Sequence, residues 1–159
     1  MIKPIINNKE LLSRPAIESP VDSCSLCIAL DLKDTLKYAW ANGSAACSIS
    51  ATEIGESEAI IAISNVIGGD ILVMFNPKII SHSDKITFWE DNLTVPNKLL
   101  KNERAHNITV DYQTENGDWQ TATYTGKLAC LIQQEVDNLL GSLPETRAIS
   151  SVDIQTNSL

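Results

Sequence analysis

The feature that most constrains this chain is a short amphipathic stretch near its C-terminal end, at residues 132–141. It reads IQQEVDNLLG, with apolar and polar residues at helical spacing and Gly141 as a stop signal. Gln134 and Asn138 are four residues apart, so on an α-helix they lie on one face, about one turn apart. We therefore predict an α-helix over residues 127–140 that presents a row of polar side chains.

This spacing is the one that metal-dependent hydrolases use on a helix. In them two histidines four apart hold the ion, and a glutamate beside the first acts as general base on a metal-bound water. Here Gln134 and Asn138 occupy the two ligand positions, and only Glu135 keeps its type. Neutral amides are poor ligands for Zn²⁺ or Fe²⁺. The pattern alone is also typical of an ordinary amphipathic helix with polar surface residues.

Other segments of the chain extend the comparison with metal-dependent hydrolases. The order and spacing of four segments resemble peptide deformylase, the bacterial enzyme that removes the formyl group from nascent N-formylmethionine. The family's helix reads Gln-His-Glu-x-Asp-His-x-x-Gly. This chain matches it at four positions, Gln133, Glu135, Asp137 and Gly141. The family's second motif supplies a cysteine ligand, and here Asn92 stands at that place within EDNLTVP at residues 90–96.

The family's first motif, Gly-x-Gly-x-Ala-Ala-x-Gln-Val-Gly, corresponds here to ACSISATEIG at residues 46–55. Both early glycines are replaced, and Glu53 replaces the glutamine that helps to hold the reacting carbonyl. Arg104 lies where the family has an arginine, whereas Leu99 replaces another arginine that the family uses near substrate. The resemblance covers nearly the whole chain.

The resemblance also implies where a site would lie. All three metal ligands are substituted, by Asn92, Gln134 and Asn138, so we expect neither a metal nor another cofactor. No catalytic residue is expected at the degenerate active-site positions, Glu53, Leu93 and Glu135. The family's apolar side-chain pocket would be lined by Ile49, Leu93, Cys130 and Leu131.

The predicted fold class is α+β, with mainly antiparallel strands around one central helix that carries the degenerate Gln-Glu-x-x-Asn motif. A second helix, at residues 23–42, packs outside. Strands are predicted at residues 59–63, 71–75, 85–89, 93–95, 107–112 and 119–124, and an Asn-Gly turn joins the last two. The single domain spans residues 23–149, between an irregular arm at 1–22 and a mobile tail at 150–159.

Composition limits the partners. A net charge of −8 argues against nucleic acid and anionic membrane as ligands. No signal peptide or membrane-spanning run is visible, so a cytoplasmic location is expected, with the four cysteines reduced. Cys24 and Cys27 form a Cys-x-x-Cys without a second pair, and we expect them to be buried thiols on the first helix.

With every ligand replaced, we expect a catalytically inactive deformylase-like domain. It would serve as a structural or protein-interaction subunit of a larger assembly, such as a viral or ribosome-associated particle. One alternative is a module that binds methionine-like N-terminal peptides. Another is a hydrolase with altered metal dependence that relies on Glu135. A hard-cation site built from Glu53 and Glu135 is a further alternative, since Ca²⁺ and Mg²⁺ prefer oxygen ligands.

Overall fold

The structure, a computed structural model, describes residues 1–154. Its elements are α1 (Lys9–Leu12), α2 (Ser23–Ala41), β1 (Ser48–Ser50), the 3-10 helix η1 (Ala51–Ile54), β2 (Ile60–Ile63), β3 (Leu72–Asp91), β4 (Lys98–Gln113), β5 (Trp119–Thr125), α3 (Gly126–Leu139), α4 (Pro144–Arg147) and β6 (Ser150–Asp153). The strands form one antiparallel sheet in the order β1-β2-β3-β4-β5, and β6 also pairs with β4.

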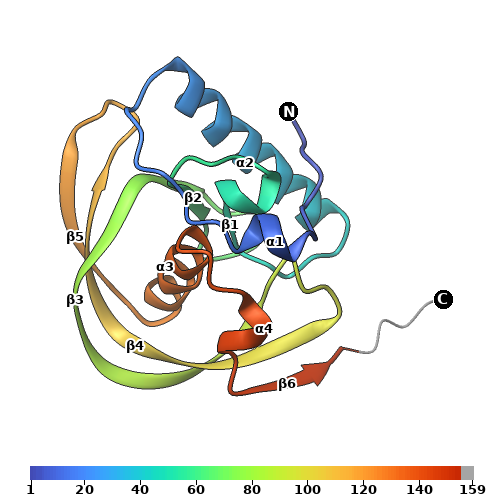
Figure 1. Ribbon diagram of the computed structural model, residues 1–159. Helices are drawn as coiled ribbons and strands as arrows, with labels where there is room; N and C mark the ends of the chain where they lie inside the picture. Colours follow the sequence, from blue (N-terminus) through green and yellow to red (C-terminus); the bar gives the residue numbers. More distant parts are fainter. Residues whose placement is uncertain (155–159) are drawn as a thin grey trace.

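Helix α3 lies inside the curve that β3 and β4 make, while α2 lies on the other side of β1 and β2 (Figure 1). Buried clusters lie on both sides of β2, because successive residues of a strand point to opposite faces of the sheet. On β2, Ile60 joins the buried cluster with α2, and Ile61 joins the cluster with α3. The predicted α+β fold with antiparallel strands around a central helix is confirmed.

Helix α2, predicted at residues 23–42, begins at Ser23 as predicted and ends at Ala41. The Asp22 carboxylate accepts a hydrogen bond from the Ser25 backbone at 3.0 Å, and the Ser25 hydroxyl accepts one from the Asp22 backbone at 2.8 Å. This reciprocal capping satisfies backbone donors of the first turn. Both Cys24 and Cys27 are exposed, so the prediction that they are buried thiols is wrong. The buried stripe of α2 instead includes Leu32 and Leu36.

Strand β3 does not stop at Asn76-Pro77 as predicted. Its pairing with β4 shifts register between Phe75 and Lys78, and this bulge accommodates the proline, which has no N–H to donate. Asn76 takes a positive φ of 51°, and its side-chain amide donates to the Ser19 carbonyl at 2.8 Å. One continuous strand therefore replaces the two that were predicted at residues 71–75 and 85–89.

Two further expectations about strands need correction. Residues 93–95 form a turn between β3 and β4 rather than a strand. Residues 150–153, predicted to begin a mobile tail, form β6 and pair with the start of β4. Residues 155–159 of that predicted tail lie outside the described part of the chain. The hairpin predicted around Asn116-Gly117 is confirmed as β4–β5, with Gly117 at a φ of 82°.

The N-terminal arm wraps the domain and is tied to it by backbone hydrogen bonds. The Ile6 N–H donates to the Glu53 carbonyl at 2.8 Å, and the Ala16 N–H donates to the Leu139 carbonyl at 2.7 Å. Between these bonds lies the one-turn helix α1. Among residues 1–154, no helix combines the length and apolar character needed to span a membrane.

Candidate functional site

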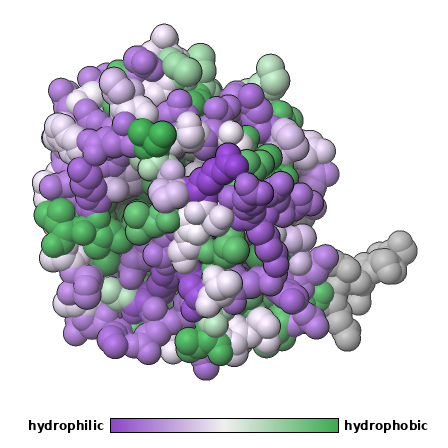
Figure 2. Space-filling model, viewed as in Figure 1, coloured by the Kyte–Doolittle hydropathy of each residue, from purple (hydrophilic) through white to green (hydrophobic). Residues whose placement is uncertain are grey.

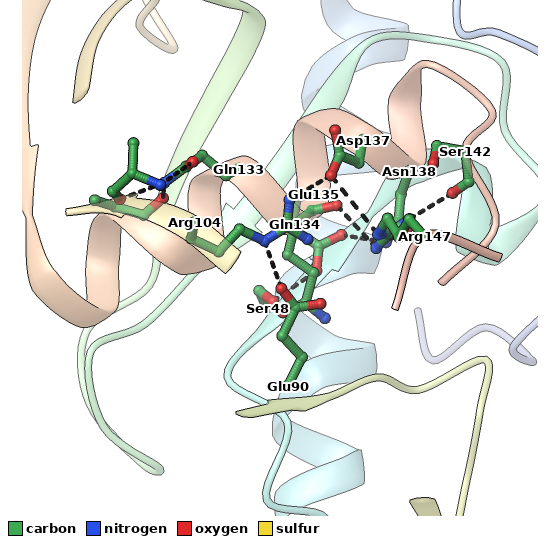
Figure 3. Close-up of polar contacts among 12 residues, drawn as sticks. Ser48, Glu90, Arg104, Gln133, Gln134, Glu135, Asp137, Asn138, Ser142 and Arg147 are labelled. Atoms are coloured by element: carbon green, nitrogen blue, oxygen red, sulfur yellow. Dashed lines mark hydrogen bonds and ion pairs between the residues drawn. The ribbon is translucent and has the colours of Figure 1, made fainter. Parts of the chain in front are cut away.

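Helix α3 presents the predicted polar row to the protein interior. Gln134, Glu135 and Asn138 are all buried, whereas Gln133 and Asp137 are half-buried (Figure 3). The alternative of a simple surface polar face is therefore wrong. A helix can bury three polar side chains only if the surrounding structure supplies hydrogen-bond partners.

Glu135 has two such partners. The Ser48 hydroxyl on β1 donates to Oε1 at 2.5 Å, and the Asn138 amide donates to Oε2 at 3.0 Å. Burial raises the pKa of the Glu135 carboxyl, while the hydrogen bonds from Ser48 and Asn138 lower it. Both oxygens are therefore held in fixed positions by donors that favour the charged form.

Glu53 lies beside Glu135 and forms a carboxyl pair with it. Within η1, its Oε2 accepts hydrogen bonds from the Ser50 backbone at 2.7 Å and the Ser50 hydroxyl at 3.2 Å. Burial raises the pKa of Glu53 well above its ordinary value, and the neighbouring Glu135 carboxylate raises it further. The two carboxyl groups are thus close enough for one to affect the pKa of the other. We infer that Glu53 carries the proton and that Glu135 is the carboxylate.

The side-chain amides of Asn92 and Gln134 each have one atom in a hydrogen bond and, among residues 1–154, one atom without a partner. Asn92 Oδ1 accepts from the Thr94 backbone at 3.0 Å and from the Thr94 hydroxyl at 2.6 Å, which directs Nδ2 the other way. Gln134 Nε2 donates to the Asp91 carbonyl at 3.4 Å. Within the described chain, Asn92 Nδ2 and Gln134 Oε1 are buried without a hydrogen-bond partner. One free donor and one free acceptor thus lie at two of the predicted ligand positions.

Arg104 supports α3 from the sheet. Its guanidinium donates to the buried Glu90 carboxylate at 2.6 Å and also to Asp137 on α3. Gln133 holds the same two elements together, because its amide bonds both backbone groups of Ala105 on β4. These contacts explain the matches to the deformylase pattern at Arg104, Gln133 and Asp137, since they fix α3 against the sheet.

Arg147 on α4 belongs to the site but was missed in the sequence. Its guanidinium donates to the Asn138 side-chain oxygen at 3.0 Å and to the Ser142 carbonyl at 2.5 Å. The first bond orients the Asn138 amide so that its nitrogen faces Glu135. Ser48 was also missed. Neither residue has a local signal, because each meets α3 only through the tertiary fold.

The predicted peptide-pocket residues lie in the interior. Ile49 and Leu131 are fully packed in the two core clusters, and Cys130 is buried, where burial raises its pKa to about 11. Leu93 is half-buried in the turn after Asn92 and packs against the cluster beneath α2. A peptide pocket at these four residues stays a prediction.

The fold and the site together indicate a protein family. The sheet curls around a central helix, and that helix carries a buried polar site. A model of the polypeptide deformylase family matches residues 6–152. The chain therefore belongs to the polypeptide deformylase family.

Individual relatives of the chain support this family assignment. Peptide deformylase 1 of Vibrio vulnificus is 31% identical over 139 residues, which cover 87% of this chain and 76% of the relative. Peptide deformylase of Agrobacterium fabrum is 30% identical over 148 residues, which cover 89% and 84%. Among solved structures, a peptide deformylase from Legionella pneumophila matches with a TM-score of 0.83 and 27% identity, covering 92% of this chain and 86% of that one. An actinonin complex of the Synechococcus elongatus enzyme matches with a TM-score of 0.82 and 28% identity, covering 92% and 80%.

These findings contradict the prediction of a catalytically inactive pseudoenzyme that acts as an interaction subunit. That prediction inferred loss of activity from the amides at the ligand positions. The relatives that cover most of the chain, and the matching solved structures, are named as peptide deformylases, and nothing among them indicates a pseudoenzyme. The predicted loss of the metal site conflicts with the same names. A protein partner stays a prediction.

The donor set itself does not fit the ion that the resemblance implies. Where the family has a thiolate and two imidazoles, this chain has three neutral amides, which bind Zn²⁺ or Fe²⁺ poorly. In the part of the chain that the structure describes, His, Cys, Asp and Glu side chains form no group of three or more that could hold a metal ion. A hard cation at Glu53 and Glu135 would likewise have only two carboxylates.

Proposed function

We propose that this chain hydrolyses the formamide bond of N-formylated peptides, the reaction for which its relatives are named. The observation that carries the proposal is the buried carboxyl pair of Glu53 and Glu135, whose exposed fractions are 1% and 0%. Glu135 stands at the position of the family's catalytic glutamate. Two carboxyl groups that share one proton supply both an acid and a base at one place.

In the proposed reaction, the Glu135 carboxylate removes a proton from a water molecule as the water oxygen attacks the formyl carbon. The Glu53 carboxyl gives its proton to the departing amide nitrogen as the carbon–nitrogen bond breaks. The products are formic acid, which ionises to formate, and a peptide with a free amino group. The proton taken up by Glu135 passes to the neighbouring Glu53 carboxylate and restores the pair.

The two free amide ends are complementary to a formamide. Asn92 Nδ2 can donate to the formyl oxygen, on which negative charge develops during attack. Gln134 Oε1 can accept from the formamide N–H. A formamide that bonds to both atoms would satisfy two buried polar atoms that have no other partner among residues 1–154.

Hydrolysis of formyl-Met-Ala-Ser by the purified protein tests the proposal. We expect release of the free amine at a rate that a chelator does not change. Glu135→Gln should lower kcat by about 100-fold or more, as expected for loss of a general base. Glu103→Gln, at an exposed carboxylate on β4, is the matched control and should retain full activity.

Two results would overturn this proposal. Absence of turnover by the wild-type protein, with or without added Fe²⁺, Ni²⁺, Co²⁺ or Zn²⁺, would show that the protein lacks this activity. Turnover only when one of these metals is added would retain the substrate but disprove the carboxyl-pair mechanism.

A further inference from the structure

Two thiols lie on the outer surface of the domain, away from the site on α3. Cys24 and Cys27 belong to the first two turns of α2 and are both exposed, whereas Cys47 and Cys130 are buried. Helix α2 is separated from α3 by β1 and β2 (Figure 1). The surface over α2, in the upper part of Figure 2, is mainly hydrophilic with only small apolar patches. This surface therefore suits a small charged ligand better than an apolar partner.

Helical spacing makes Cys24 and Cys27 a pair. Residues three apart on an α-helix are neighbours, with about 5–6 Å between their Cβ atoms. A disulfide needs a Cβ separation of about 3.5–4.5 Å, so the pair could close one only if the helix were distorted. Rotation about the two Cα–Cβ bonds can instead bring both sulfurs to the two sides of one ion without any movement of the backbone. The geometry of α2 therefore favours a bound ion over a disulfide.

Helix α2 is held in place without an ion at these thiols. Its first turn is closed by the reciprocal hydrogen bonds of Asp22 and Ser25, and its buried stripe includes Leu32 and Leu36. Since neither the cap nor the buried stripe uses the two thiols, both sulfurs are available to a ligand from solution. An ion bound there can therefore exchange with solvent without unfolding the helix.

Negative charge surrounds the start of α2. Desolvation, followed by the carboxylates of Glu58 and Asp22, raises the pKa of the Cys24 thiol. In the described part of the chain, Glu58 Oε2 is buried without a hydrogen-bond partner. Carboxylates that disfavour a further negative charge attract a cation, and a thiol that coordinates a metal ion is deprotonated outright. The charges around the pair thus favour a positive ligand.

The number and the softness of the ligands select the ion. Thiolates prefer soft ions such as Cu⁺ and Zn²⁺. A structural zinc site takes four ligands, and among residues 1–154 no group of three or more His, Cys, Asp and Glu side chains could hold a metal ion. Cu⁺, in contrast, is stable with two sulfur ligands on opposite sides. We propose that Cys24 and Cys27 bind one Cu⁺ ion between their sulfurs, at an exchangeable site that is independent of the proposed function.

Competition for Cu⁺ tests this proposal. The fully reduced protein is titrated under nitrogen into the coloured complex of Cu⁺ with bicinchoninate, and the fall in absorbance measures the copper withdrawn. The wild-type protein should withdraw one ion per chain, and Cys27→Ser should withdraw none. The matched control is the double variant Cys27→Ser, Leu30→Cys. It keeps two thiols at exposed positions of α2 but places them six residues apart, on different faces of the helix. It should also withdraw none.

Three results would overturn the proposal. The first is a reduced wild-type protein that withdraws no copper, whether or not it closes a Cys24–Cys27 disulfide with oxidised glutathione. The second is equal uptake by the wild-type protein and Cys27→Ser, since Cys47 and Cys130 remain in both proteins and would then be the ligands. The third is equal uptake by the double variant, which would show that any two exposed thiols suffice.

Discussion

Ser48 and Glu135 are separated by 87 positions in the sequence, yet the Ser48 hydroxyl donates a 2.5 Å hydrogen bond to the Glu135 carboxylate. Both side chains are buried, so this bond links β1 to the central helix through the interior of the domain. The family's first motif has a glycine at the position of Ser48, so the serine adds a donor that the motif lacks. Its effect on the carboxyl pair can be measured.

Removal of this donor should destabilise the fold. Ser48→Ala leaves Glu135 Oε1 without its hydroxyl partner in a buried setting, which costs about 1–3 kcal/mol. Urea unfolding monitored by fluorescence measures the change in the free energy of unfolding. Ser151→Ala, at an exposed site on β6, makes the same chemical change and should alter stability little. Equal effects of the two variants would contradict the assigned role of Ser48.

The carboxyl pair should make the fold sensitive to pH. Burial raises the pKa of both Glu53 and Glu135 above the ordinary value of 4.5, so the folded state binds protons more tightly than the unfolded state. This contribution to stability is complete below pH 4.5 and is lost as the pH rises through the raised values. Glu53→Gln removes one titrating group and should flatten the decline in unfolding free energy. A wild-type slope retained in Glu53→Gln would show that Glu53 is not the protonated partner.

Arg147 should contribute more to stability than a surface arginine does. Arg147→Met removes the charged donor to the Asn138 oxygen and the Ser142 carbonyl, which costs about 1.5–3 kcal/mol. Arg14→Met is the matched control, because the Arg14 side chain forms an exposed ion pair with Glu10, which is worth roughly 0–1 kcal/mol. Thermal unfolding compares the two variants, and similar losses would argue against a structural role for Arg147.

Gly141 should be irreplaceable for two separable reasons. Its φ is +79°, and a Cβ at this position would lie 2.3 Å from the Ser13 carbonyl oxygen of the N-terminal arm. Gly43 has a similar φ of +85° but nothing within 4 Å. Gly43→Ala therefore measures the backbone strain alone, about 1–2 kcal/mol. Gly141→Ala should cost clearly more in urea unfolding, and the difference reports the contact with the arm. If the two costs are equal, that contact does not matter.

The sequence determined those features that depend on local chemistry. The spacing of apolar residues predicts α3, and the row formed by Gln134, Glu135 and Asn138 follows directly from helical geometry. Helix α2 begins at residue 23 as predicted, and Asn116-Gly117 forms the turn between β4 and β5, because caps and turns depend on a few adjacent residues.

Only the tertiary structure decided how these elements meet. Glu53 and Glu135 form a pair because η1 packs on α3, and no local pattern indicates that the two carboxyl groups lie together. Proline predicts the end of a strand at Asn76-Pro77, yet pairing with the long strand β4 carries β3 past it through a bulge. Such outcomes depend on contacts between segments far apart in the chain, whose free energies exceed the local preferences that a sequence pattern reveals.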